Sequence, residues 1–119
     1  MKKTVVLGAT PNKRRYAFWA VKNLVKHKHE VIPLGIKQGE VAGQSIIHGR
    51  PEIEDVHTIT LYIGPSRQKE YYEYLISLSP KRIIFNPGTE NPELKNMAQQ
   101  KGIETLEDCT LMMLDSGRY

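Results

Sequence analysis

The sequence has a single cysteine, Cys109, among its 119 residues. One thiol cannot form an intramolecular disulfide, and it cannot supply a metal centre built from several cysteines. No apolar run approaches the length of about 20 residues that a membrane-spanning helix needs. The first residues, from Met1 to Lys3, lead directly into an apolar segment and lack the features of a signal peptide. We therefore expect a cytoplasmic protein that has no membrane partner.

Two nucleotide-binding motifs are also missing. The dinucleotide fingerprint Gly-x-Gly-x-x-Gly is absent, since the residues after Gly8 read Ala-Thr-Pro-Asn-Lys, and no P-loop Gly-Lys-Ser/Thr follows. An NAD site also needs an acidic residue at the end of the second strand, where this chain has Pro33-Leu34-Gly35. Lys37, just beyond, suits a phosphate instead. A nucleotide with an additional ribose phosphate, such as NADP, therefore fits better than NAD.

The charge balance is mildly basic. The chain has 17 Lys and Arg against 13 Asp and Glu, a net charge of +4, which fits an anionic ligand. The basic residues are dispersed except at residues 13–15, and they do not alternate with aromatic residues as in RNA-binding modules. We therefore expect no nucleic-acid partner. The length suits one domain over residues 1–119, without an internal repeat or linker.

Strand-like apolar segments alternate with helical patterns along the chain. This alternation predicts an α/β fold: a Rossmann-like, doubly wound parallel sheet of about five strands in three layers, α/β/α. Val56–Ile63 has the strongest β composition and is expected to be a central strand, whereas Ser45–Ile47 is expected to be a short edge strand. The other expected strands are Thr4–Leu7, Glu30–Leu34, Arg82–Phe85 and Ile103–Leu106.

Helices are expected between these strands. The apolar spacing predicts helices over Arg14–Lys26 and Ser66–Leu78, with Ser66 as the N-cap of the second. Asn91-Pro92 is typical of a helix start, and Gly102 of a helix end. A short final helix, capped by Asp108, is expected to carry Leu111, Met112 and Leu114.

The segment from Thr4 to Tyr16 combines a buried strand, a turn of small residues and the start of a helix. In doubly wound proteins this unit binds phosphate, because backbone N–H groups and the helix N-terminus face the anion. Lys13, Arg14 and Arg15 lie where cations oppose the helix dipole. A bound phosphate would reverse that unfavourable interaction; the alternative is that these side chains point into solvent.

Four expected strand ends carry a glycine, namely Gly8, Gly35, Gly64 and Gly88. Ligands of open α/β sheets bind at the carboxyl ends of the strands. The four turns therefore outline one candidate cleft at one edge of the sheet, and Lys37 offers it a cation.

Several runs of residues resemble those of a known family. They are the Gly-Ala-Thr-Pro-Asn turn at residues 8–12 with Arg15-Tyr16, Val31-Ile32-Pro33 before Gly35 and Lys37, Thr58–Tyr62 before Pro65, Phe85–Pro92, and Cys109–Met112. The chain resembles the small stand-alone CoA-binding proteins, whose Rossmann-like domain is similar to the CoA-binding domain of the succinyl-CoA synthetase alpha subunit. The resemblance covers nearly the whole chain. It implies binding of coenzyme A or an acyl-CoA, a small-molecule nucleotide ligand. Because the acyl-transfer domains of larger relatives are absent, the resemblance implies binding rather than turnover.

The resemblance also implies roles for individual residues. The CoA pyrophosphate would lie against Gly8, Ala9, Thr10 and Pro11, assisted by Lys13, Arg14 or Arg15. The adenosine end would be bordered by Pro33, Gly35 and Lys37, with Lys37 near the ribose phosphate. The next wall would be lined by Ile63, Gly64 and Pro65, and the pantetheine arm would be bordered by Asn86, Pro87 and Gly88.

No pattern of residues indicates catalysis or a metal site. The histidines are not spaced as metal ligands; they are His27, His29, His48 and His57. At a helix start, Cys109 could have a lowered thiol pKa and form a mixed disulfide with CoA; the alternative is a small buried side chain. Glu90 could act as a base or could order its turn.

The leading hypothesis is thus binding of CoA or an acyl-CoA without catalysis. One alternative is an NADP-dependent or CoA-thiol-dependent enzyme that uses Cys109 or Glu90. Another is a regulatory protein with a vestigial nucleotide cleft, which Tyr16 or Arg15 would block. The sequence leaves a homo-oligomer open.

Overall fold

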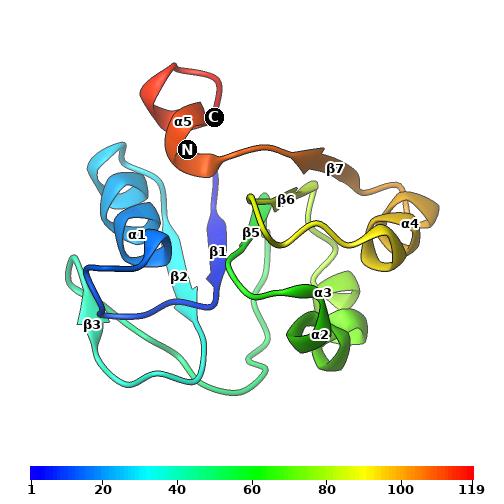
Figure 1. The fold of residues 1–119 in the computed structure, drawn as a ribbon, viewed down its shortest axis with the longest axis horizontal. Coiled ribbons are helices and arrows are strands. Elements are labelled where there is room, and N and C mark those ends of the chain that lie inside the picture. The colour runs from blue at the N-terminus through cyan, green and yellow to red at the C-terminus, as the bar shows by residue number, and fades with distance from the viewer.

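The computed structural model describes residues 1–119 and contains a five-stranded parallel sheet with helices on both faces (Figure 1). This confirms the predicted Rossmann-like α/β fold. The strand order is β2-β1-β5-β6-β7, and a two-stranded hairpin of β3 and β4 lies outside this sheet. The strands are β1 (Thr4–Leu7), β2 (Val31–Leu34), β3 (Glu40–Val41), β4 (Gln44–Ser45), β5 (Thr58–Leu61), β6 (Arg82–Phe85) and β7 (Glu104–Glu107).

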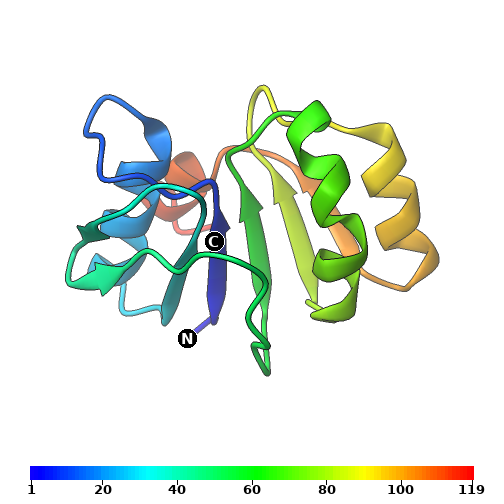
Figure 2. The same cartoon turned by 90° about the horizontal axis from the view of Figure 1, so that it is seen from below.

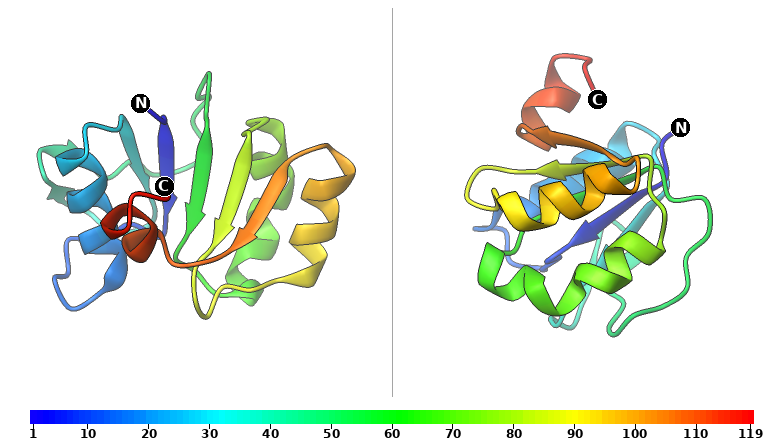
Figure 3. Two further views of the ribbon diagram at one scale, coloured as in Figure 1. Left: turned by 90° about the horizontal axis from the view of Figure 1, so that it is seen from above. Right: turned by 90° about the vertical axis from the view of Figure 1, so that its right-hand side faces the viewer.

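Alternating side chains of the strands build two separate cores. Val5 and Leu7 of β1 belong to a core with residues of α3 (Tyr72–Ser77) and α4 (Pro92–Gln100). Val6 points to the other face and shares a core with α1 (Tyr16–Lys26) and α5 (Thr110–Asp115). Because successive strand residues point to opposite faces, both faces of the sheet must be covered. Figures 2 and 3 show α1 grouped with α5, and α2–α4 grouped separately.

Two helices of the structure differ from the predicted ones in where they begin or in their continuity. Helix α1 begins at Tyr16 rather than Arg14, because the Asn12 side chain accepts the Arg14 N–H and Arg15 is extended. The predicted helix over residues 66–78 is three pieces: α2 (Pro65–Gln68), the 3-10 turn η1 (Lys69–Tyr71) and α3. Its N-cap is Gly64 rather than Ser66, since Pro65 occupies the first helical position.

The edge of the sheet beside β2 also differs from the prediction. Residues 44–45, not 45–47, form β4, which pairs with β3 in antiparallel orientation. Ile47 forms a single parallel bridge to Leu34, so it extends the sheet by only one residue. No helix connects β2 to β5; instead the loop after Ile47 packs on the α3 side, where the Tyr74 hydroxyl donates to Pro51 O at 2.6 Å.

The last two helices are capped by asparagines. Asn91 caps α4 as predicted, since its side chain accepts the N–H groups of Glu93 and Leu94. Helix α5 has Cys109, not Asp108, at its N-cap position. The Asn86 side chain, from the end of β6, accepts the N–H of Thr110, the first residue of α5, at 2.9 Å.

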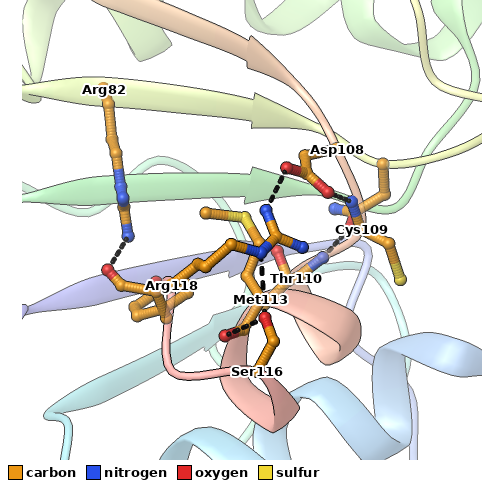
Figure 4. Close-up of polar contacts among 9 residues, drawn as sticks. Arg82, Asp108, Cys109, Thr110, Met113, Ser116 and Arg118 are labelled. Atoms are coloured by element: carbon orange, nitrogen blue, oxygen red, sulfur yellow. Dashed lines mark hydrogen bonds and ion pairs between the residues drawn. The ribbon is translucent and has the colours of Figure 1, made fainter.

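The last residues fold back from α5 along the sheet (Figure 4). Arg118 Nη1 lies 3.0 Å from Asp108 Oδ2. The Tyr119 hydroxyl lies 2.6 Å from Thr4 Oγ1, and the guanidinium of the buried Arg82 lies 4.4 Å from the centre of the Tyr119 ring. The end of the described chain thus covers the amino ends of β1 and β6. None of the helices combines the length and the apolar character that a membrane span requires.

Two histidines lie at this amino edge of the sheet. His29 Nδ1 accepts the Lys2 N–H at 3.0 Å. His57 Nδ1 lies 2.7 Å from Thr58 Oγ1, which also accepts a hydrogen bond from Arg82 Nε. Burial lowers the pKa of both histidines, and nearby cations, led by Lys2 for His29 and Arg82 for His57, lower it further.

We expect the free energy of unfolding to fall as the pH drops below the ordinary histidine pKa of 6.5. Below that pH the two histidines bind protons more readily in the unfolded chain than in the folded one, so protonation favours unfolding. Urea unfolding between about pH 8 and pH 5.5 measures this slope. The double variant His29→Asn, His57→Asn keeps an acceptor near each Nδ1 and should show a shallower slope; an unchanged slope would assign it to other groups.

Candidate functional site

A cavity of about 430 Å³ opens at the carboxyl ends of the strands. It lies where the chain leaves β1 toward α1 on one face and leaves β5 toward α2 on the other (Figure 2). In open α/β sheets such a switch point is the usual place for a ligand. The turns after β1, β2, β5 and β6 all contribute to its lining.

Two glycines let these turns approach one another closely. Gly8 has a φ of +99°, and a Cβ at this position would lie 2.9 Å from Ile63 Cγ2 and 3.0 Å from the Tyr62 carbonyl oxygen. A Cβ on Gly35 would lie 3.1 Å from the Ala9 carbonyl oxygen. The floor of the cleft is therefore closed by backbone packing that a larger residue at either position would disturb.

At the first turn, free hydrogen-bond donors remain on Thr10 and at the start of the helix. The N–H groups of Gly8 and Ala9 both donate to Leu34 O, at 2.8 and 3.1 Å, and so are already engaged. Helix α1, in contrast, has no capping side chain and no acidic residue in its first turn. Its uncapped N–H groups, at Tyr16 and Ala17, lie on residues that line the cleft. Such an end favours a bound anion.

Three cationic side chains line the cleft, and no carboxylate does. Arg15 comes from the start of α1, Lys37 from the loop after β2, and Arg67 from α2. They belong to three different connections of the sheet, so the fold rather than the sequence spacing gathers them. Arg67 is absent from the predicted site, because nothing around it in the sequence distinguishes it from a surface arginine.

The residues predicted for the site divide into two groups. Those that line the cleft are Gly8, Ala9, Thr10, Arg15, Gly35, Lys37, Ile63, Gly64, Pro87 and Gly88. Those outside its lining are Pro11, Lys13, Arg14, Pro33, Pro65 and Asn86. Lys13, Arg14 and Pro65 are exposed, whereas Pro33 is buried within β2. Asn12, Tyr16, Tyr71 and Thr89 line the cleft without having been predicted.

Asn86 lies beneath the cleft rather than in its wall. It is 2 % exposed, and its Nδ2 donates to Thr60 Oγ1 at 2.6 Å and to Leu61 O at 2.9 Å. Its Oδ1 accepts the Thr110 N–H. These three side-chain hydrogen bonds of Asn86 join β6 to β5 and to α5. The Asn86 backbone carbonyl accepts both the N–H and the hydroxyl of Thr89, which orders the turn above it.

The two candidate reactive residues do not line the cleft. Glu90 Oε1 accepts the Gly88 N–H at 2.9 Å, so this carboxylate orders its own turn. Cys109 is half-buried, and its backbone N–H donates to Asp108 Oδ1 at 2.7 Å (Figure 4). No three side chains of His, Cys, Asp or Glu are grouped so that they could hold a metal ion.

Tyr62 lines the cleft, and its hydroxyl is buried. The hydroxyl has no hydrogen-bond partner, and the nearby hydroxyls of Thr60 and Thr110 bond to each other at 2.7 Å. Burial raises the pKa of Tyr62 well above its ordinary value.

Replacing Tyr62 by phenylalanine should leave the protein as stable as the wild type or stabilise it by about 1 kcal/mol, since an unpaired buried hydroxyl carries a desolvation cost. Chemical unfolding of the two proteins measures the difference. A loss of about 1 kcal/mol or more would show that the hydroxyl is hydrogen-bonded in solution.

Comparison with known proteins agrees with this architecture. Residues 2–115 match a family described as CoA binding domain. A crystal structure of an uncharacterized protein is 55% identical, with 100% of this chain and 98% of that chain covered and a TM-score of 0.98. A hypothetical protein from Pyrococcus horikoshii OT3 is 27% identical, with 97% and 82% covered and a TM-score of 0.84. Among curated proteins, none matches. The chain belongs to the CoA binding domain family.

Proposed function

We propose that this protein binds coenzyme A or an acyl-CoA reversibly in the cleft between β1 and β5, without catalysing a reaction. The main support for this proposal is that one cleft is lined by Arg15, Lys37 and Arg67 and by no carboxylate. CoA has anionic groups at two places, the pyrophosphate and the ribose phosphate, so cations from separate loops suit it. Membership of the CoA binding domain family supports the same ligand.

The cleft offers complementary surfaces to the parts of CoA. The uncapped N-terminus of α1, with Arg15, suits the pyrophosphate. Lys37, in the loop after β2, suits the ribose phosphate. The walls at residues 63–64 and 87–89 present backbone and small side chains to the uncharged pantetheine arm. The cavity volume of about 430 Å³ is in the range of roughly 300–1,000 Å³ typical of small-molecule sites.

The lining of the cleft supports binding rather than turnover. It contains no His, Cys, Asp or Glu, and so lacks the side chains that most often act as a general base. Neither Cys109 nor Glu90 lines the cavity. Tyr16 is 76 % exposed and Arg15 borders the cavity, and neither fills it, in contrast to the blocked cleft expected of a vestigial site.

Calorimetric titration with CoA and with dephospho-CoA tests the proposal. We expect CoA to bind with one site per chain and dephospho-CoA to bind about tenfold more weakly, because it lacks the phosphate assigned to Lys37. Prolonged incubation with acetyl-CoA should release no free thiol. If neither CoA nor acetyl-CoA binds, the proposed function is wrong. Thiol release would overturn the absence of catalysis.

A further inference from the structure

We propose that Gln68 is a positioning residue that fixes the separation of two cleft walls, the turn after β5 and the turn after β6. The inference rests on the proposed function, since it concerns the part of the cleft assigned to the pantetheine arm. Gln68 is the last residue of α2 and is 0 % exposed, which is unusual for a long polar side chain. Its neighbour Arg67 lines the cleft, whereas Gln68 is enclosed by protein.

The Gln68 amide joins the two turns directly. Its Nε2 donates to Ile63 O at 2.9 Å and to Thr89 O at 2.8 Å. Ile63 and Thr89 both line the cleft, and each belongs to one of the two turns. The NH₂ group has two hydrogens, and each of them holds one wall. The length of one amide group therefore sets how far apart the walls can lie.

The amide is itself held in place by two helices. Gln68 Oε1 accepts a hydrogen bond from Asn91 Nδ2 at 2.9 Å. The same Asn91 nitrogen donates to the Tyr72 hydroxyl at 2.8 Å, and its oxygen caps α4. These three side chains come from α2, α3 and the start of α4, which lie together on one side of the sheet (Figure 1). Every polar atom of the Gln68 side chain is thus used, as a buried amide requires.

The variant Gln68→Met tests this role, because it keeps the length of the side chain and removes both donors. We expect its affinity for CoA to fall about tenfold or more, since the walls along the pantetheine arm are no longer held. Its affinity for adenosine 3′,5′-bisphosphate, which has no pantetheine arm, should change less than about twofold. The control is Gln99→Met, which removes an exposed amide bonded to Thr105 Oγ1 and should change neither affinity.

The variant Gln68→Glu adds a test that depends on pH. An ionised carboxylate would face the two carbonyl oxygens without a proton, whereas the protonated acid can again donate to one of them. Burial raises the pKa of a carboxyl group, so protonation falls within an accessible range. The ratio of the variant's CoA affinity to that of the wild type at the same pH should rise as the pH falls. A ratio independent of pH would contradict the role.

The outcomes separate this inference from the proposed function. An equal loss of affinity for both ligands in Gln68→Met would mean that Gln68 supports only general stability, and would overturn the inference. If the wild type binds no CoA, the proposed function fails, but amide exchange in the free protein still tests Gln68. The Thr89 N–H, which donates to Asn86 O, should exchange faster in Gln68→Met than in Gln99→Met. Equal exchange rates would overturn the inference.

Discussion

Replacing Asn86 by alanine is expected to lower the free energy of unfolding by about 3–5 kcal/mol, a large part of the stability of a domain of this size. The change removes a donor to Thr60 Oγ1 and Leu61 O and an acceptor from the Thr110 N–H. It leaves the Leu61 carbonyl and the Thr110 N–H buried without these partners, and each unpaired group costs about 1–3 kcal/mol. Equilibrium unfolding in urea measures the loss.

Asn96→Ala is the matched control, because Asn96 is an exposed residue of α4. Its free energy of unfolding should stay within about 0.5 kcal/mol of the wild type. The variant Asn86→Asp keeps the acceptor for Thr110 and loses both donors, so its stability should also fall. A loss below about 1 kcal/mol in Asn86→Ala would show that water or a neighbouring group replaces the amide.

The triple variant Arg15→Gln, Lys37→Gln, Arg67→Gln is expected to bind CoA at least about 1,000-fold more weakly than the wild type. Each cation should contribute roughly 1.5–3 kcal/mol through hydrogen bonds to a charged phosphate, or about tenfold or more in affinity. The three side chains approach the cleft from different connections, so their single effects should be separable. Calorimetric titration of the single and triple variants measures them.

The neighbouring cations provide the control. Lys13 and Arg14 directly precede Arg15 in the chain, but both are exposed and outside the lining of the cleft. The double variant Lys13→Gln, Arg14→Gln changes the net charge by two and should weaken CoA binding less than about threefold, through long-range attraction alone. A loss as large as that of Arg15→Gln would mean that overall charge, not the cleft, binds the ligand. Lys37→Gln should also abolish the preference for CoA over dephospho-CoA.

The sequence predicted the fold well, because strong local signals set each main element. The β-branched segments at Thr4–Leu7 and Arg82–Phe85 became strands with the predicted bounds, and Asn91-Pro92 began a helix as predicted. The errors in the helices lie where side chains or turns compete with the helix. Asn12 draws the Arg14 N–H into a turn, and Gly64-Pro65 starts α2 one residue before the predicted cap.

The candidate site was only partly predictable. Glycine at strand ends is a local signal, and the turns of Gly8, Gly35, Gly64 and Gly88 do meet at one cleft. The contributions of Arg67 and Gln68 depend on the direction in which adjacent residues of one short helix point, which the sequence does not show. Asn86 belongs to the most distinctive run in the chain, yet its amide turns inward to the strands and α5.

The bond between Thr4 and Tyr119 spans 115 positions of the chain. Residue 119 must therefore be synthesised before Thr4 of β1 can form this hydrogen bond. Until then the Arg82 guanidinium lacks the aromatic ring and the carbonyl of Tyr119 that contact it in the folded protein. A nascent chain stalled just short of this point would leave that end of the sheet open to water and to chaperones.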